Sequence, residues 1–160
     1  MTADDTGKTG GPASARRAFH EDYRWDRVEL HPYKDDGRAI FKDVTRQTLV
    51  SRPDIAGELR YFEVAPGGHS TLERHGHVHG VLILRGRGRA LVGAEVLDLE
   101  TNDLVTVPPM TWHQFRALPD SPLGFLCMVD AVRDKPQLPE AADFEALRRN
   151  ARIAKFLDGQ

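Results

Sequence analysis

The chain has very little cysteine: Cys127 is the only one among its 160 residues. A single cysteine forms no internal disulfide, and a cysteine-based metal site needs several. The composition therefore favours a reducing cytoplasmic compartment. Cys127 is then either a packed thiol that behaves as a small hydrophobe or a lone reactive thiol.

Long apolar runs and an excess of positive charge are also missing. No run of about 18 apolar residues is present, and the N-terminus holds Asp4 and Asp5 without an apolar segment, so we expect neither a membrane span nor a secretory signal. Lysine and arginine number 22 against 24 aspartates and glutamates, a formal net charge of -2. This balance supplies no basic field for phosphate backbones, so we expect no nucleic-acid partner.

The chain divides by composition into three predicted parts. Residues 1–18 have little to bury and are expected to form a flexible arm, and residues 19–135 are expected to form a β-barrel domain. Aromatic residues between Phe19 and Tyr33 alternate with charges, which predicts a segment that packs its rings on the core or on another subunit. In residues 136–160, apolar residues recur at three- and four-residue steps after Pro139. This spacing predicts one amphipathic helix or two short ones broken near Asn150.

Short apolar runs separated by Gly, Pro, Asn or Asp predict an all-β sandwich or barrel. The expected strands are residues 39–50, 58–65, 72–76, 79–85, 88–92, 95–99, 104–107 and 123–131. We expect turns at Pro66-Gly67-Gly68, at Arg85-Gly86-Arg87-Gly88 and at Pro108-Pro109. In the last strand, alternation predicts that Phe125, Cys127 and Val129 share one face.

Four of the seven histidines, His69, His75, His77 and His79, fall within eleven residues. Strand alternation places Glu73 and His75 on one face, and a turn around residues 76–78 directs His79 toward the same point. Imidazoles with one carboxylate suit a divalent metal such as Mn, Fe, Ni or Zn. Two alternatives stay open: the histidines belong to the surface of a hairpin, or His77 replaces Glu73 or His79 as a ligand.

Two spaced motifs resemble those of the cupin superfamily. Its first motif has a Gly, three ligands and a second Gly; the residues at those spacings are Gly67, Glu73, His75, His79 and Gly86. The second motif is matched by Asn102, Pro108, Met110 and His113. The resemblance implies an antiparallel jelly-roll barrel, a double-stranded β-helix, with a metal held by Glu73, His75, His79 and His113, and Mn²⁺ is the favoured ion.

The chain departs from the usual cupin motifs in two respects. Its first motif runs Glu, His, His, where a cupin usually has two His and then a Glu, although one carboxylate and three imidazoles are retained. Asn102 and Met110 stand where the second motif has glycine. Asn takes the left-handed conformation readily, whereas Met110 puts the geometry of that turn in doubt.

Further segments resemble a small bacterial group of single-domain cupins that includes the 1-methylthioxylulose 5-phosphate methylsulfurylases of sulfur salvage. The segments are residues 60–63, 70–75, 82–88, 108–116 and 124–129. The resemblance implies a sugar-phosphate substrate, a thiol such as glutathione as co-substrate and Cys127 as the catalytic thiol carrier. We also expect a homodimer. The alternative is a metal-dependent dioxygenase or isomerase of another small oxygenated metabolite. Arginines 60, 74, 87 and 116 are candidates for the phosphate, and none is assigned.

Overall fold

The computed structural model describes residues 16–34 and 40–160. Most of the predicted arm, residues 1–15, lies outside the described residues. In chain order the elements are β1 (Phe19–His20), β2 (Arg24–Trp25), β3 (His31–Pro32), β4 (Lys42–Val50), β5 (Gly57–His69), β6 (His79–Val92), β7 (Glu95–Glu100), β8 (Leu104–Val107), β9 (His113–Ala117), β10 (Leu123–Asp130), α1 (Ala141–Arg148) and α2 (Ala151–Leu157).

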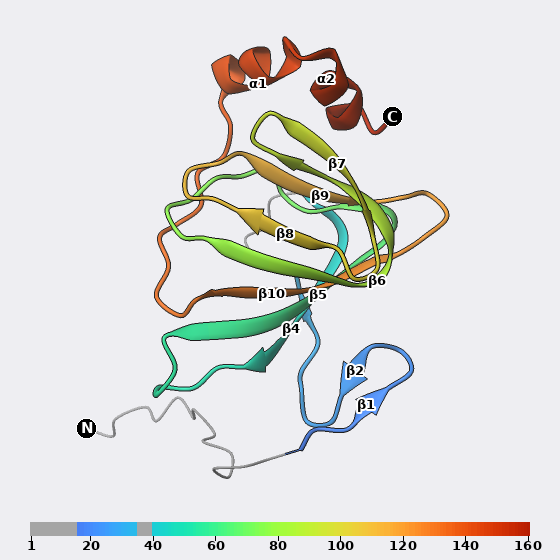
Figure 1. Cartoon of the computed structure of the whole chain (residues 1–160), viewed down its shortest axis with the longest axis vertical. Coiled ribbons are helices and arrows are strands. Elements are labelled where there is room, and N and C mark those ends of the chain that lie inside the picture. Colours follow the sequence, from blue (N-terminus) through green and yellow to red (C-terminus); the bar gives the residue numbers. More distant parts are fainter. Residues whose placement is uncertain (1–15, 35–39) are drawn as a thin grey trace, which may run out of the picture.

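The main sheet closes on itself through its last strand. Strand β10 pairs antiparallel with both β5 and β6, and β9 also pairs with both of these strands. Strands β7 and β8 add to β6, and β4 with β3 adds to β5 (Figure 1). The structure therefore confirms the predicted all-β class and the antiparallel barrel.

The interior of the barrel follows the side-chain alternation of its strands. In β10, Phe125, Cys127 and Val129 are buried while Met128 is exposed, as the sequence predicts. They join a core of apolar side chains from both walls, which includes Val64, Ile83 and Phe115. Because successive residues point to opposite faces, the register of β10 decides which side chains reach the interior.

The two C-terminal helices cover one end of the barrel, beside β7 (Figure 1). Of the two predicted alternatives, one helix or two, the structure has two, and they are separated at Asn150. The Asn150 side chain accepts hydrogen bonds from the backbone N–H groups of Arg152 and Ile153. Ile153 and Phe156 of α2 pack with Leu91 in a second apolar cluster. No helix of the described residues is long and apolar enough to cross a bilayer.

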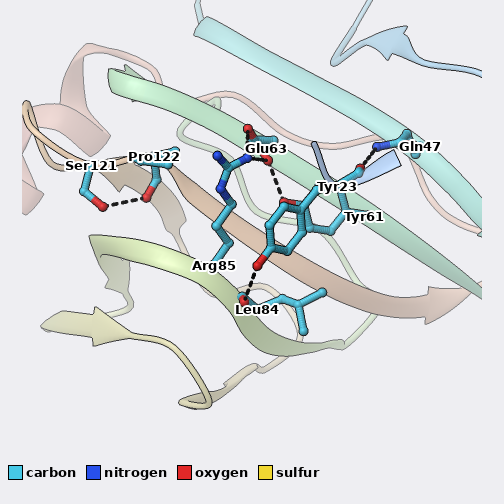
Figure 2. A network of polar contacts seen from close by, with 8 residues as sticks. All are labelled: Tyr23, Gln47, Tyr61, Glu63, Leu84, Arg85, Ser121 and Pro122. Carbon is cyan, nitrogen blue, oxygen red and sulfur yellow. Dashed lines mark hydrogen bonds and ion pairs between the residues drawn. The ribbon is translucent and has the colours of Figure 1, made fainter. Parts of the chain in front are cut away.

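The aromatic segment near the N-terminus packs on the outer wall of the same barrel. Tyr23 stacks on Tyr61 with ring centroids 5.7 Å apart, and Trp25 meets the same ring edge-on. Glu63 accepts hydrogen bonds from the Tyr61 hydroxyl at 2.6 Å and from Arg85 at 2.8 Å (Figure 2). These contacts account for the aromatic residues within one chain, and the homodimer stays a prediction.

Two predicted turns lie inside strands instead. Strand β5 runs through Gly67, and β6 runs through Gly86, although both glycines have positive φ angles of 74° and 73°. At Gly86 the backbone of another segment passes so closely that a Cβ atom would lie 1.8 Å from the carbonyl oxygen of Pro122. Here the glycine accommodates a close approach between strands and does not end the strand.

The segment 72–76 also differs from its prediction. It forms two isolated bridges, Glu73 with His113 and Arg74 with Gln137, and no continuous strand. Strand β9, by contrast, was not among the expected strands. The bridge from Glu73 is still enough to align the two histidine-bearing segments with each other.

The two left-handed glycines offer a matched test of the close approach at Gly86. Gly67→Ala introduces only the left-handed strain, because no atom lies within 4 Å of its added Cβ, and is expected to lower the free energy of unfolding by about 1 kcal/mol. Gly86→Ala adds a clash with backbone and is expected to cost about 3 kcal/mol. Chemical denaturation of both variants measures the difference, and equal losses would contradict the role given to Gly86.

Candidate metal centre

Three histidines converge at one end of the barrel. His75 lies in the segment between β5 and β6, His79 is the first residue of β6, and His113 is the first residue of β9. One ligand atom from each lies within 4.8 Å of the other two. The backbone bridge between Glu73 and His113, with N–H···O distances of 3.1 and 3.0 Å, holds the two motifs side by side.

The outer nitrogen of each imidazole has a partner. Nδ1 of His75 donates to the carbonyl oxygen of His77 at 3.0 Å, and Nδ1 of His113 donates to that of Thr111 at 2.9 Å. Nδ1 of His79 lies 3.5 Å from the sulfur of Cys127. A ring that donates from Nδ1 keeps its lone pair on Nε2, which is the form that ligates a metal.

Two of the three inner nitrogens have no hydrogen-bond partner within the described residues. Nε2 of His75 and Nε2 of His79 are buried and make no hydrogen bond. Burial, followed by the neighbouring imidazoles, lowers the pKa of His75 to about 4 and that of His79 to about 2. Neutral imidazoles with unsatisfied nitrogens facing one another fit a divalent metal, because an unpaired buried polar atom is otherwise costly.

The predicted fourth ligand, Glu73, is buried next to this cluster but is not within the 4.8 Å group of the three histidines. Its carboxylate forms an ion pair with Lys34. Burial lowers the pKa of His113. Glu73 and Lys34 make smaller contributions of opposite sign, so both charges lie within electrostatic range of the cluster. Ligation by Glu73 therefore stays a prediction, and it requires the carboxylate to exchange Lys34 for the metal.

His77, which lies outside the motif positions, forms a second candidate metal-binding group with His75 and Asp134. Its ring stacks on His75 at a centroid distance of 3.6 Å, and its Nδ1 lies 2.7 Å from the carboxylate of Asp134. Asp134 also accepts from the backbone N–H of Gly76 at 2.7 Å. These contacts, that of Gly76 first, lower the pKa of Asp134 to about 2. Asp134 thus fixes the loop whose carbonyl orients His75.

Asp134 and Lys34 are not among the predicted site residues. Each is a single charged residue outside the two motifs, and no local pattern marks it. Asp134 follows β10, and Lys34 follows β3, so only the folded barrel brings them to the histidines. The one sequence feature that points to Asp134 is its position just beyond the strand that carries Cys127.

The two residues that replace glycine adopt the conformation that glycine would. Asn102 has a φ of 80° and Met110 a φ of 55°. The backbone N–H of Met110 donates to the carbonyl oxygen of His75 at 2.7 Å. The doubtful turn is therefore formed, at the cost of left-handed strain in Met110, and it ties the second motif to the first.

Cys127 lies beside the cluster, on the inner face of β10, and is 1% exposed. Burial raises the pKa of its thiol, and the guanidinium of Arg60 acts in the opposite direction. If His79 holds a metal through Nε2, its Nδ1 would carry the proton and would donate to the sulfur of Cys127. The thiol thus contacts the side of His79 away from its free nitrogen.

Comparison with known proteins agrees with this geometry. Residues 60–129 match the sequence model of the family described as "Cupin domain". A protein of Rhodospirillum rubrum named 1-methylthio-D-xylulose 5-phosphate methylsulfurylase is 59% identical over 143 residues, which cover 89% of this chain and 92% of the relative. The chain belongs to the cupin family.

Solved cupin structures share the whole barrel. A cupin 2 conserved barrel domain protein from Rhodopseudomonas palustris is 55% identical with a TM-score of 0.85, over 89% of this chain and 98% of that one. A cupin-2 domain protein from R. rubrum is 57% identical with a TM-score of 0.82, over 91% and 97%. The similarity to these cupins extends through most of the described chain, beyond the two motifs.

Metal content separates the ligand histidines from His77. We expect His75→Ala, His79→Ala and His113→Ala to lose bound metal, because each removes one of three converging nitrogens. His77→Ala is the matched control and should keep most of its metal. Elemental analysis of the purified variants measures this. Retained metal in the first two together with loss in His77→Ala would overturn the assignment.

The position of Glu73 has its own test. If its carboxylate joins the histidines, Glu73→Gln should weaken metal binding by about tenfold or more, because an amide is a poorer ligand than a carboxylate. Titration of the metal-free protein with Mn²⁺ measures the dissociation constant. Unchanged affinity would show that Glu73 only forms the ion pair with Lys34 and that the three histidines bind the metal without it.

Proposed function

We propose that this cupin is a metal-dependent methylsulfurylase: it removes the methylthio group of 1-methylthioxylulose 5-phosphate, passes it to a thiol and gives 1-deoxyxylulose 5-phosphate. The observation that carries the proposal is the contact between Cys127 and His79, which puts the only thiol of the chain against a candidate metal ligand. The methylsulfurylase of R. rubrum at 59% identity supports the same reaction.

His75, His79 and His113 would hold the metal, with Glu73 as the expected fourth ligand and Mn²⁺ as the favoured ion. Fe, Ni and Zn also suit this donor set. When bound, the metal supplies Lewis-acid polarisation of the substrate's carbonyl and hydroxyl oxygens. The backbone carbonyls of His77 and Thr111 keep two of the rings in the tautomer that binds.

Cys127 carries the group transfer in this proposal. Its thiolate attacks the methylthio sulfur, so that a sulfur–sulfur bond forms and the bond from that sulfur to C1 breaks. The electron pair of the broken bond moves into the neighbouring carbonyl as an enolate, and a proton added at C1 completes the deoxy sugar. The methylthio group is now held on Cys127 as a mixed disulfide.

A second thiol restores the enzyme. Glutathione, as thiolate, attacks the methylthio sulfur of the mixed disulfide and leaves as methyl glutathionyl disulfide, and Cys127 departs as thiolate. The net reaction consumes one thiol for each substrate, with the carbon of C1 reduced and the two sulfurs oxidised to a disulfide. No further oxidant or reductant is needed.

The test is a turnover assay with the metal-loaded protein, 1-methylthioxylulose 5-phosphate and glutathione. We expect 1-deoxyxylulose 5-phosphate to form, and Cys127→Ser to reduce kcat by about a hundredfold or more, because the hydroxyl is a far weaker nucleophile. Metal content of Cys127→Ser serves as the control, since the variant keeps all three histidines. Full activity in Cys127→Ser would exclude the thiol-carrier step, and no turnover by metal-loaded wild-type protein would exclude the reaction.

A further inference from the structure

Arg60 is a buried charge inside the barrel. It lies on β5 directly opposite Cys127 of β10 and is 9% exposed. Its guanidinium carbon is 5.1 Å from the centre of the Phe62 ring, an inner-face neighbour on the same strand. Burial is the main cause of the lowered pKa of His79, and Arg60 makes a smaller contribution in the same direction. A cation thus stands beside both the thiol and the histidine cluster.

This charge has no carboxylate partner within residues 16–34 and 40–160. The structure gives Arg60 no ion pair there, and its Nε is buried without a hydrogen bond. The nearby acid, Glu58, already accepts from Arg133 at 2.6 Å and from Ser51 at 3.0 Å. Burial lowers the pKa of Arg60, which nevertheless stays protonated as arginines do. The Cys127 thiol is its polar neighbour inside the barrel. Buried charges are normally paired with an opposite charge, so a guanidinium that has only a thiol beside it points to an anionic ligand.

We propose that Arg60 binds an anionic oxygen of the substrate inside the barrel, next to Cys127 and His79. The identity of that substrate rests on the proposed function, and a sugar phosphate offers two such oxygens. One is the phosphate, which is charged throughout. The other is the carbonyl oxygen that gains charge as the bond from C1 to sulfur breaks. A guanidinium suits either, since it presents several N–H donors in one plane.

Stability distinguishes this role from a structural one. Arg60→Met removes an unpaired buried charge and keeps a similar apolar stem, so the thermal midpoint should stay level or rise. Arg85→Met is the matched control: Arg85 donates to the two carboxylate oxygens of Glu63 at 2.8 and 2.9 Å on the outer wall of the barrel. Its loss should lower the midpoint and leave substrate kinetics unchanged. A fall in the midpoint of Arg60→Met to match the control would overturn the proposal.

Binding and kinetics identify the oxygen. If Arg60 holds the phosphate, Arg60→Met should weaken binding of 1-deoxyxylulose 5-phosphate by about tenfold or more and leave that of unphosphorylated 1-deoxyxylulose unchanged. If it stabilises the developing charge, both affinities should hold while kcat falls by about a hundredfold. Arg60→Lys should recover part of either loss, since it restores the charge. Smaller changes in both quantities would overturn the proposal.

Two further measurements separate the competing explanations. The rate at which iodoacetamide alkylates Cys127 measures the reactivity of the thiol. If Arg60→Met lowers this rate by the same factor as kcat, Arg60 acts by activating the thiol, and the proposal is overturned. If wild-type protein does not turn over the methylthio sugar, the proposed function fails, and inorganic phosphate becomes the probe. Phosphate that raises the midpoint of wild type but not of Arg60→Met would still support an anion site, and an equal response would overturn it.

Discussion

The pairing of β10 with two strands at once is the constraint on which the site depends. One edge of β10 is bonded to β5 and the other to β6, so its register is set from both sides. That register puts Cys127 between Arg60 and Val81 and turns its side chain inward. A slip of one residue would send Met128 to the interior and the thiol to the surface. The position of the thiol at this end of the barrel therefore depends on hydrogen bonds between strands that are far apart in the sequence.

The histidines are held before any ligand arrives. Backbone carbonyls orient His75 and His113, the sulfur of Cys127 touches His79, and Asp134 secures the loop beneath. A centre organised in this way loses little conformational freedom when it binds, which favours affinity. Glu73 differs, because its carboxylate is already neutralised by Lys34. The histidine nitrogens are thus already oriented for a metal, whereas the Glu73 carboxylate must first leave Lys34.

Alternation and motif spacing were enough to predict much of this arrangement. They placed Cys127 on one strand face together with Phe125 and Val129, and they brought His113 to His75 and His79 from a distant segment. They also gave a helix break near Asn150 as one of two alternatives. These features depend on neighbours in sequence or on a fixed spacing between them. The predicted turn at Gly86 was wrong. A glycine is needed there because the backbone of Pro122 passes too close for a Cβ atom, and no local pattern reveals this approach. Lys34 and Asp134 could not be predicted either, because their contacts with the site are also long-range.

Met110 shows what the second motif specifies. Its backbone takes the left-handed conformation, and its N–H reaches the carbonyl of His75 although its side chain carries a Cβ that disfavours this geometry. Asn102 does the same at the other glycine position. The requirement at both places is thus a dihedral angle, which glycine meets at the lowest cost and other residues meet when the surrounding hydrogen bonds compensate. A search pattern that insists on glycine there would pass over barrels that are folded in the same way.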